Sequence, residues 1–227
     1  MAARKVRKTT EDVLLILCES VKKILTIATK SDITYSPMIQ KTIKTCLRPD
    51  IGCFVLFQGG FSGLVVMNFS SGAAVEVYRR YLMSMGLPEE ELATYHTSDD
   101  VGNSLGELMN QIVGNFQAEV KRELRVSVNQ NQPKMIVLNQ ELLVAVNAKI
   151  DSPQCRRASF ETADHHPFYV ELAMEKTEFI LLFPFEKDED VDPEKIIEEH
   201  RNEETLEEIP TIDHGKADLD FMKELGL

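Results

Sequence analysis

The sequence predicts an α+β fold, in which helices pack against a largely antiparallel sheet. Helical patterns occur in three segments, and most of the remaining chain consists of β-rich runs separated by short turns. In chain order the segments are a helix, strands, two helices and then strands, which is typical of helices packed on an antiparallel sheet. Apolar residues make up 43% of the chain, which is enough to bury a core.

The first half of the chain predicts two helices and a β-hairpin. A capping pattern opens the first helix, β-branched and aromatic residues mark the strands, and glycines mark the turn between them. The predicted elements are a helix at 9–29, strands at 50–58 and 64–70 joined by the glycine-rich turn 59–63, a helix at 71–85 and a short helical turn at 88–94.

The second half predicts one long helix followed only by strands. Asp99 and Asp100 supply negative charge where the helix begins, which favours its amino-terminal end. The predicted elements are this helix at 99–123 and strands at 134–139, 142–150, 158–162, 168–175 and 178–185.

The long helix carries a polar stripe in addition to a complete apolar face. At about 100° per residue, Asn103, Glu107, Asn110 and Gly114 project within roughly 60° of one another. The apolar side chains project around the opposite side and serve the core; they are Leu105, Leu108, Met109, Ile112, Phe116 and Val120. The stripe therefore faces either solvent or a partner protein.

The residue types in the stripe suit recognition of a partner. Glu107 and Asn110 are three apart and so neighbours on the helix surface. A carboxylate can pair with a lysine, whereas an amide can donate and accept at once and thereby hold a water molecule. Gly114 costs about 1 kcal/mol relative to alanine inside a helix, which suggests close approach by another backbone or side chain.

The run Glu107-x2-Asn110-x3-Gly114-Asn115 resembles the active-site helix of the CheC/CheX/FliY family, which are bacterial chemotaxis phosphatases. The family signature is Asp/Ser-x3-Glu-x2-Asn-x22-Pro, and Pro133 stands at the required distance after Asn110. The sequence departs from it at Asn103, where the family has Asp or Ser. The resemblance covers about residues 9–185 in element order and 103–133 in motif. It implies a CheC-like fold with a pseudo-symmetric internal duplication.

The resemblance implies hydrolysis of the aspartyl phosphate on a CheY-like receiver domain of a response regulator. Asn110 would orient the attacking water and Glu107 would pair with the receiver's lysine, while Asn103, Gly114 and Pro133 would support them. The Mg²⁺ would belong to the receiver, so this chain would bind no cofactor and no metal itself. Two alternatives remain: a non-catalytic CheC-like binding or scaffold module, and a regulatory domain that senses a small ligand.

The first helix is expected to lack a second copy of the site. Its corresponding residues are Glu19, Lys22 and Thr26, so lysine replaces the asparagine and threonine replaces the glycine. One site per chain is typical of CheX-like members, and these pair through their sheets. We therefore expect a homodimer.

The negative charge is concentrated in the C-terminal part. Residues 186–227 hold sixteen acidic and five basic residues, a net charge of −11, out of −12 for the whole chain. The sequence thus predicts a CheC-like domain at 1–185 and an acidic extension at 186–227. A nearly neutral body argues against a dedicated nucleic-acid surface.

The sequence fits a bacterial cytoplasmic protein. No apolar run approaches the eighteen or so residues of a membrane span, and the basic N-terminus lacks the apolar core of a signal peptide. That N-terminus could be a nucleic-acid arm, but a solvated end is the preferred interpretation. Four cysteines without metal or redox spacing are expected to be reduced and mostly buried; they are Cys18, Cys46, Cys53 and Cys155.

Three further features have alternative interpretations. Asp164-His165-His166-Pro167 could supply metal ligands, although a simple turn is the preferred interpretation. The amphipathic end at 217–227 is either a frayed terminus or a docking segment. The apolar strand at 179–185 needs cover at its edge, for which a second subunit or the tail is expected.

Overall fold

The computed structural model describes residues 6–138, 142–143, 153–175 and 177–181. Contacts divide the chain into two units, residues 1–183 and 184–227, and every described residue belongs to the first. The acidic extension expected at 186–227, with its amphipathic end, lies outside the described residues. Within the described part, none of the helices combines the length and the apolar character that a bilayer crossing requires.

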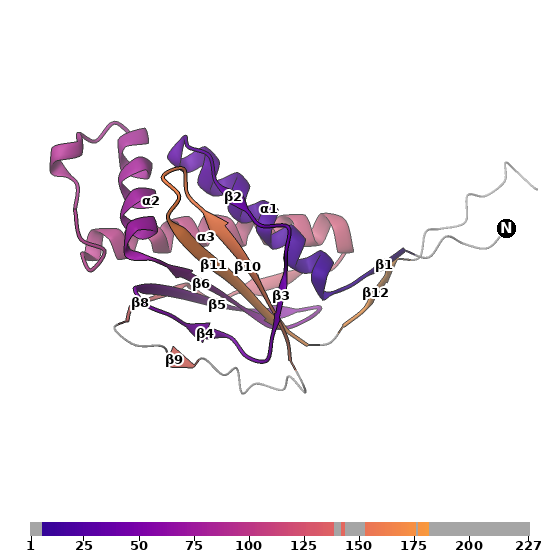
Figure 1. Ribbon diagram of the computed structural model, residues 1–227. Coiled ribbons are helices and arrows are strands. Elements are labelled where there is room, and N and C mark those ends of the chain that lie inside the picture. The colour runs from indigo at the N-terminus through magenta and orange to yellow at the C-terminus, as the bar shows by residue number, and fades with distance from the viewer. Residues whose placement is uncertain (1–5, 139–141, 144–152, 176, 182–227) are drawn as a thin grey trace, which may run out of the picture. The chain divides into compact units, whose positions relative to one another are not determined.

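An eight-stranded sheet forms the centre of the described unit (Figure 1). The strand order is β2-β10-β11-β6-β5-β7, with β3 also beside β10 and β8 also beside β5, and every pair is antiparallel. The prediction of a largely antiparallel sheet is confirmed. The strands are β2 (Thr34–Tyr35), β3 (Gln40–Thr42), β5 (Ile51–Gly59), β6 (Gly63–Phe69), β7 (Val128–Gln130), β8 (Lys134–Val137), β10 (Gln154–Glu161) and β11 (Pro167–Met174).

Three helices cover one face of this sheet (Figure 1). Each begins at a hydroxyl residue, because a side-chain oxygen there can accept the free N–H groups of the first turn. Ser70 accepts from Ala73, Ser98 accepts from Asp100, and Thr9 forms a capping box with Asp12. The helices are α1 (Thr10–Thr29), α2 (Ser71–Ser84) and α3 (Asp99–Leu124), with a short 3₁₀ turn at Glu89–Glu91.

The main core lies between the helices and the sheet. Strand residues alternate between the two faces, so β5 sends Cys53, Val55 and Phe57 to the helices, where they meet residues such as Phe116 of α3. The same alternation sends Leu64 and Val66 of β6 to the opposite face. There they pack with Leu47 in a smaller cluster.

Two short strands lie over the opposite face of the sheet. β4 (Cys46–Leu47) pairs with β9 (Leu142–Leu143). Two buried polar side chains hold this segment: Glu171 accepts from the Cys46 N–H at 3.0 Å, and Asn68 donates to the Cys46 carbonyl at 2.9 Å. Glu171 also pairs with Arg157 at 2.7 Å, so its buried charge is compensated.

The N-terminus, expected as a solvated end, has an exposed side chain at Arg7 but also contains a strand that was not predicted. Val6–Lys8 form β1, which pairs with β12 (Phe179–Leu181). The cover expected for the strand at 179–185 is therefore supplied, at 179–181, by a segment that the sequence did not suggest. Three residues are too few to show a strand pattern, and their pairing depends on a partner far along the chain.

The longer predicted elements are confirmed, with bounds that differ by a few residues. Four other strands of two or three residues were not predicted: β2, β3, β4 and β7. The strand predicted at 142–150 is present at Leu142–Leu143, and the rest of it lies outside the described residues.

Candidate functional site

The polar stripe of α3 is exposed as its spacing predicts. Asn103, Glu107, Asn110 and Gly114 face outward, whereas Leu108, Met109, Ile112 and Phe116 are buried. The amide of Asn110 is therefore free to meet another molecule rather than occupied within the core.

A cavity of about 570 Å³ opens beside this stripe. One wall is the first half of α3, with Asn103, Glu107 and Asn110, together with residues 97–99 that precede the helix. The other wall is residues 132–137, which include Pro133 and most of β8. The structure thus brings together the helix motif and the distant proline of the sequence signature.

Pro133 stands at a β-bulge. The register pairs Gln130 with Phe57 and Lys134 with Phe54, so residues 131–133 oppose only residues 55 and 56. One extra residue interrupts the ladder there, which is where a proline without an N–H group is tolerated. The bulge lies between β7 and β8 and forms part of the cavity wall.

Tyr81 of α2 supports Glu107 from behind. Its ring is buried, and its hydroxyl interacts with the side chains of Glu107 and Gln111. Burial raises the pKa of Tyr81, and the nearby charge of Glu107 raises it further. The phenol therefore stays protonated at neutral pH and can donate to the carboxylate.

The glycines of α3 differ in their surroundings. A Cβ at Gly106 would make an ordinary contact with Met135 of β8, at 3.5 Å from its Cγ. A Cβ at Gly102 or at Gly114 would meet nothing within 4 Å. Packing within the described unit therefore does not require Gly114.

The first helix presents Glu19 and Lys22 to solvent, but not as a free copy of the motif. Glu19 accepts a hydrogen bond from the Tyr35 hydroxyl at 2.5 Å, and the Oγ1 of Thr26 is buried. With lysine at the position of the amide, α1 offers no equivalent group for holding a water.

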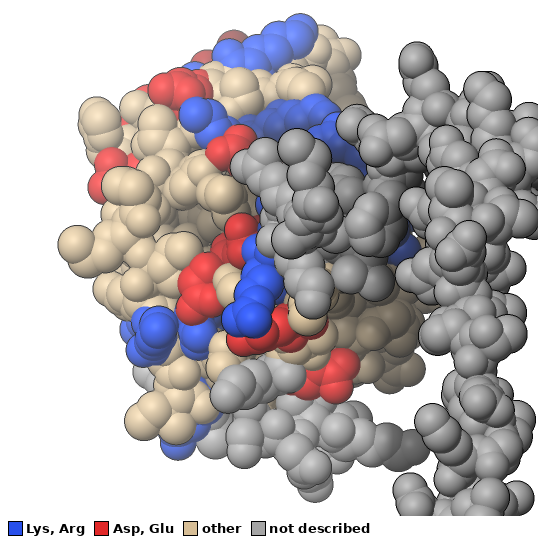
Figure 2. All heavy atoms as spheres, turned by 90° about the vertical axis from the view of Figure 1, so that its right-hand side faces the viewer, with Lys and Arg blue, Asp and Glu red and all other residues tan. Residues whose placement is uncertain are grey.

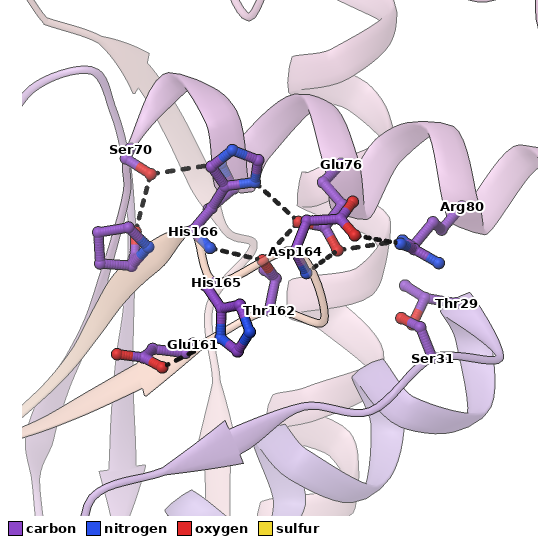
Figure 3. Close-up of polar contacts among 12 residues, drawn as sticks. Thr29, Ser31, Ser70, Glu76, Arg80, Glu161, Thr162, Asp164, His165 and His166 are labelled. Atoms are coloured by element: carbon purple, nitrogen blue, oxygen red, sulfur yellow. Dashed lines mark hydrogen bonds and ion pairs between the residues drawn. The ribbon is translucent and has the colours of Figure 1, made fainter.

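A second polar cluster lies at the turn between β10 and β11 (Figure 3). The buried carboxylate of Glu76 on α2 accepts from Thr162 Oγ1, from the Asp164 N–H at 3.2 Å and from Arg80 Nε at 3.0 Å. It also lies 2.9 Å from Nδ1 of His166. Asp164, His165 and His166 thus lie in the connection of a hairpin that one carboxylate fastens to α2, and Pro167 begins β11.

Charge is mixed on the face that Figure 2 shows. Basic and acidic side chains are interspersed there. Ion pairs form between and within helices, such as Lys23 with Glu119 at 3.9 Å and Arg122 with Glu119 at 2.5 Å.

Several residues around the site were not found from the sequence. Tyr81, Gln132, Met135 and residues 97–99 reach it from other elements.

Solved structures that resemble this chain include chemotaxis proteins. CheX from Desulfovibrio desulfuricans is 16% identical with a TM-score of 0.59, over 72% of this chain and 99% of that one. CheX of Borrelia burgdorferi, solved in a complex with CheY, BeF3 and Mg²⁺, is 14% identical with a TM-score of 0.53, over 73% and 99%. FliY from Thermotoga maritima is 16% identical with a TM-score of 0.53, over 74% and 91%.

These likenesses show that the chain has a CheC/CheX/FliY-like fold. A search of the curated proteins gave no match. A family model described as "Protein of unknown function (DUF3334)" matches residues 4–227. The chain therefore belongs to the DUF3334 family.

Proposed function

We propose that this protein hydrolyses the aspartyl phosphate of a response-regulator receiver domain. One observation carries the proposal: Glu107 and Asn110 are exposed three residues apart on α3, beside a cavity whose opposite wall includes Pro133. The sequence signature and the CheX-like fold thus coincide at one place on the surface.

The hydrolysis needs only a modest catalytic contribution from the protein, because an acyl phosphate is already reactive. A water oxygen attacks phosphorus, the P–O bond to the aspartate breaks, and its electron pair stays with the carboxylate. Asn110 holds this water in line: its amide oxygen accepts a hydrogen bond from the water, and its NH2 group donates one to the water oxygen. Such positioning replaces an unfavourable encounter with an oriented one.

Glu107 fixes the orientation of the receiver by pairing with a lysine of its active site. Tyr81 behind Glu107 limits the positions that this carboxylate adopts. The Mg²⁺ belongs to the receiver, and support comes from the CheX structure that was solved with CheY and Mg²⁺. Asn103 assists the docking, and Gly114 permits close approach.

A second candidate is a non-catalytic binding module with the same partner. The observation that favours it is Asn103, which stands where the phosphatases have Asp or Ser. In that case the receiver binds at the stripe without faster loss of phosphate. The variant Asn103→Asp distinguishes the two candidates. If the variant hydrolyses the phosphate and the wild type does not, the protein is a binding module that has lost catalysis.

Three further properties belong to this proposal. The fold contains an internal duplication that relates α1 to α3, the protein works as a homodimer, and it acts in the bacterial cytoplasm. Light scattering of the purified chain tests the second of these.

The test is the lifetime of phosphate on receiver domains, measured with wild type and three variants. Asn110→Ala is expected to lose the acceleration by about a hundredfold, because the water is no longer oriented. Glu107→Ala is expected to raise KM more than it lowers kcat. Asn129→Ala changes an exposed asparagine of β7 outside the cavity and serves as the control. Equal activity in wild type and Asn110→Ala contradicts the mechanism.

A further inference from the structure

Large apolar side chains are exposed at the carboxyl ends of α1 and α2. Ile27 of α1 is 66% exposed, Met85 at the end of α2 is 57% exposed and Leu87 just beyond it is 40% exposed. Single exposed apolar residues are ordinary, but a group of them at one place marks an interaction surface. We call these three residues the apolar rim.

The two helix ends that carry the rim are joined. The Ser84 hydroxyl of α2 donates to the carbonyl of Ala28 in α1 at 2.7 Å, and Lys30 Nζ donates to the carbonyl of Ser84 at 3.1 Å. Ile27 precedes Ala28 and Met85 follows Ser84, so both residues flank this junction. Gly86 ends α2 with a positive φ of 96°, and the N–H of Leu87 returns to Leu82 at 3.2 Å, which fixes the position of Leu87.

The rim adjoins the polar stripe of α3 on the side of α2. Tyr81 lies one turn before Met85 on α2, and its hydroxyl interacts with Glu107 and Gln111. Met85 therefore lies within about one turn, roughly 5 Å along the helix, of the residue that contacts Glu107.

The rim also adjoins the stripe on the side of α1. Helices α1 and α3 run in opposite directions (Figure 1), and Lys23 pairs with Glu119 at 3.9 Å. One turn further along α1, on the same side of the helix as Lys23, is Ile27.

The stripe alone cannot hold a folded partner. A specific complex buries about 800 Å² on each side around an apolar core from which charged residues are depleted. Asn103, Glu107, Asn110 and Gly114 supply orientation but almost no apolar area. Methionine and large aliphatic side chains next to them supply the missing kind of surface.

We infer that the apolar rim is the surface on which the phosphorylated receiver domain rests while Asn110 reaches its aspartyl phosphate. This inference rests on the proposed function and adds the part of the interface that provides affinity. The stripe then determines the docking register of the receiver and the chemistry, and the rim determines the dissociation rate of the receiver. The receiver's own matching surface is apolar and lies beside its phosphorylation site.

The chain offers matched pairs of residues for the test. Two variants alter the rim: Ile27→Ser and Met85→Ser. Two control variants change the same residue types near β2 and β3, at the sheet edge opposite β7 and β8: Ile43→Ser and Met38→Ser. Ile43 is 92% exposed and Met38 is 73% exposed. Thermal unfolding is measured for all four variants to check that each one folds.

The probes are the single-domain CheY-like receivers encoded in the same genome, each held in the phosphorylated-like state by beryllofluoride and Mg²⁺. Binding is measured by calorimetry, and turnover is measured on the phosphorylated receivers. Each rim variant is expected to raise Kd and KM about tenfold with kcat unchanged, as for the loss of a buried interface side chain. The control variants are expected to stay within about twofold of wild type.

The outcomes separate this inference from the proposed function. Rim variants that bind and turn over like wild type overturn the inference and leave the phosphatase intact. If the receiver binds wild type, binds the rim variants more weakly and loses its phosphate no faster with any of them, the rim inference is supported and the phosphatase proposal is refuted. A wild-type dimer that the rim variants dissociate, or no receiver binding at all, overturns the inference.

Discussion

The packing of the described unit does not require a glycine at position 114, whereas the proposed interface does require one. A Cβ there would meet nothing within 4 Å, so Gly114→Ala fits the helix. We expect the variant to gain up to about 1 kcal/mol in free energy of unfolding, because alanine is the better helix former. We also expect KM for a phosphorylated receiver to rise, since the new methyl group meets the incoming surface.

Gly102→Ala is the control for helix propensity, because its Cβ also meets open space. Denaturant unfolding measures both variants. A Gly114→Ala variant that is stabilised but keeps the wild-type KM shows that nothing approaches this residue closely.

Residue positions along a single helix were the most predictable part of the site. The 100° rotation per residue is enough to place Glu107 and Asn110 outside and Met109 and Ile112 inside, and the structure agrees. Contacts between elements were not predictable in this way. Tyr81 contacts Glu107 only because α2 packs across α3, and the spacing of residues along the chain does not predict this packing.

The link between α2 and the turn after β10 is expected to respond to acid. A hydrogen bond from Arg80 lowers the pKa of Asp164 below its ordinary value of 3.8, and this outweighs the opposing effect of desolvation. A carboxyl group whose pKa is lower in the folded state stabilises the fold above its unfolded pKa, and this stability is lost as the pH falls through the folded pKa.

The change that tests this link is Asp164→Asn. Its unfolding midpoint is expected to lie slightly below that of wild type at neutral pH, and the difference is expected to vanish well below pH 3.8. Thermal unfolding followed by circular dichroism across this range measures both proteins. A difference that persists in acid assigns the effect to packing rather than charge.

Elements were predictable in proportion to their length. The long helices and the hairpin of β5 and β6 show their period over many residues. The strands β1 to β4 have two or three residues each, and they are strands only because β10, β9 or β12 lies beside them. Local sequence holds no signal for a strand that a distant partner defines.

At the scale of the whole molecule, the thiols are expected to be unreactive while the protein is folded. All four cysteines are buried, as predicted, and burial raises the pKa of Cys18 and of Cys53 to about 12. The thiolate is the reactive form, so both groups stay protonated at neutral pH.

A disulfide reagent is therefore expected to label the native protein slowly and all four thiols at once in guanidinium. The absorbance of the released thiol follows both reactions. Rapid labelling of the native protein contradicts a buried position for at least one cysteine.

The layered architecture followed from the order of elements, but the order of strands did not. Grouped strands and helices predict an antiparallel sheet with helices on it. The path β2-β10-β11-β6-β5-β7 depends on which hydrophobic faces fit together, and the cover over the opposite face depends on buried polar groups such as Glu171 and Asn68. Neither the order of the strands nor this cover can be predicted from a short stretch of sequence.

The pairing of β1 with β12 has a consequence for the order of folding. Residues 6–8 precede α1, yet their partners are residues 179–181, so nearly the whole unit has to be synthesised before this ribbon can form. Contacts of such sequence separation carry a large loop-closure cost and arise late. On the ribosome, the first strand of the chain therefore waits for the last strand of the described unit.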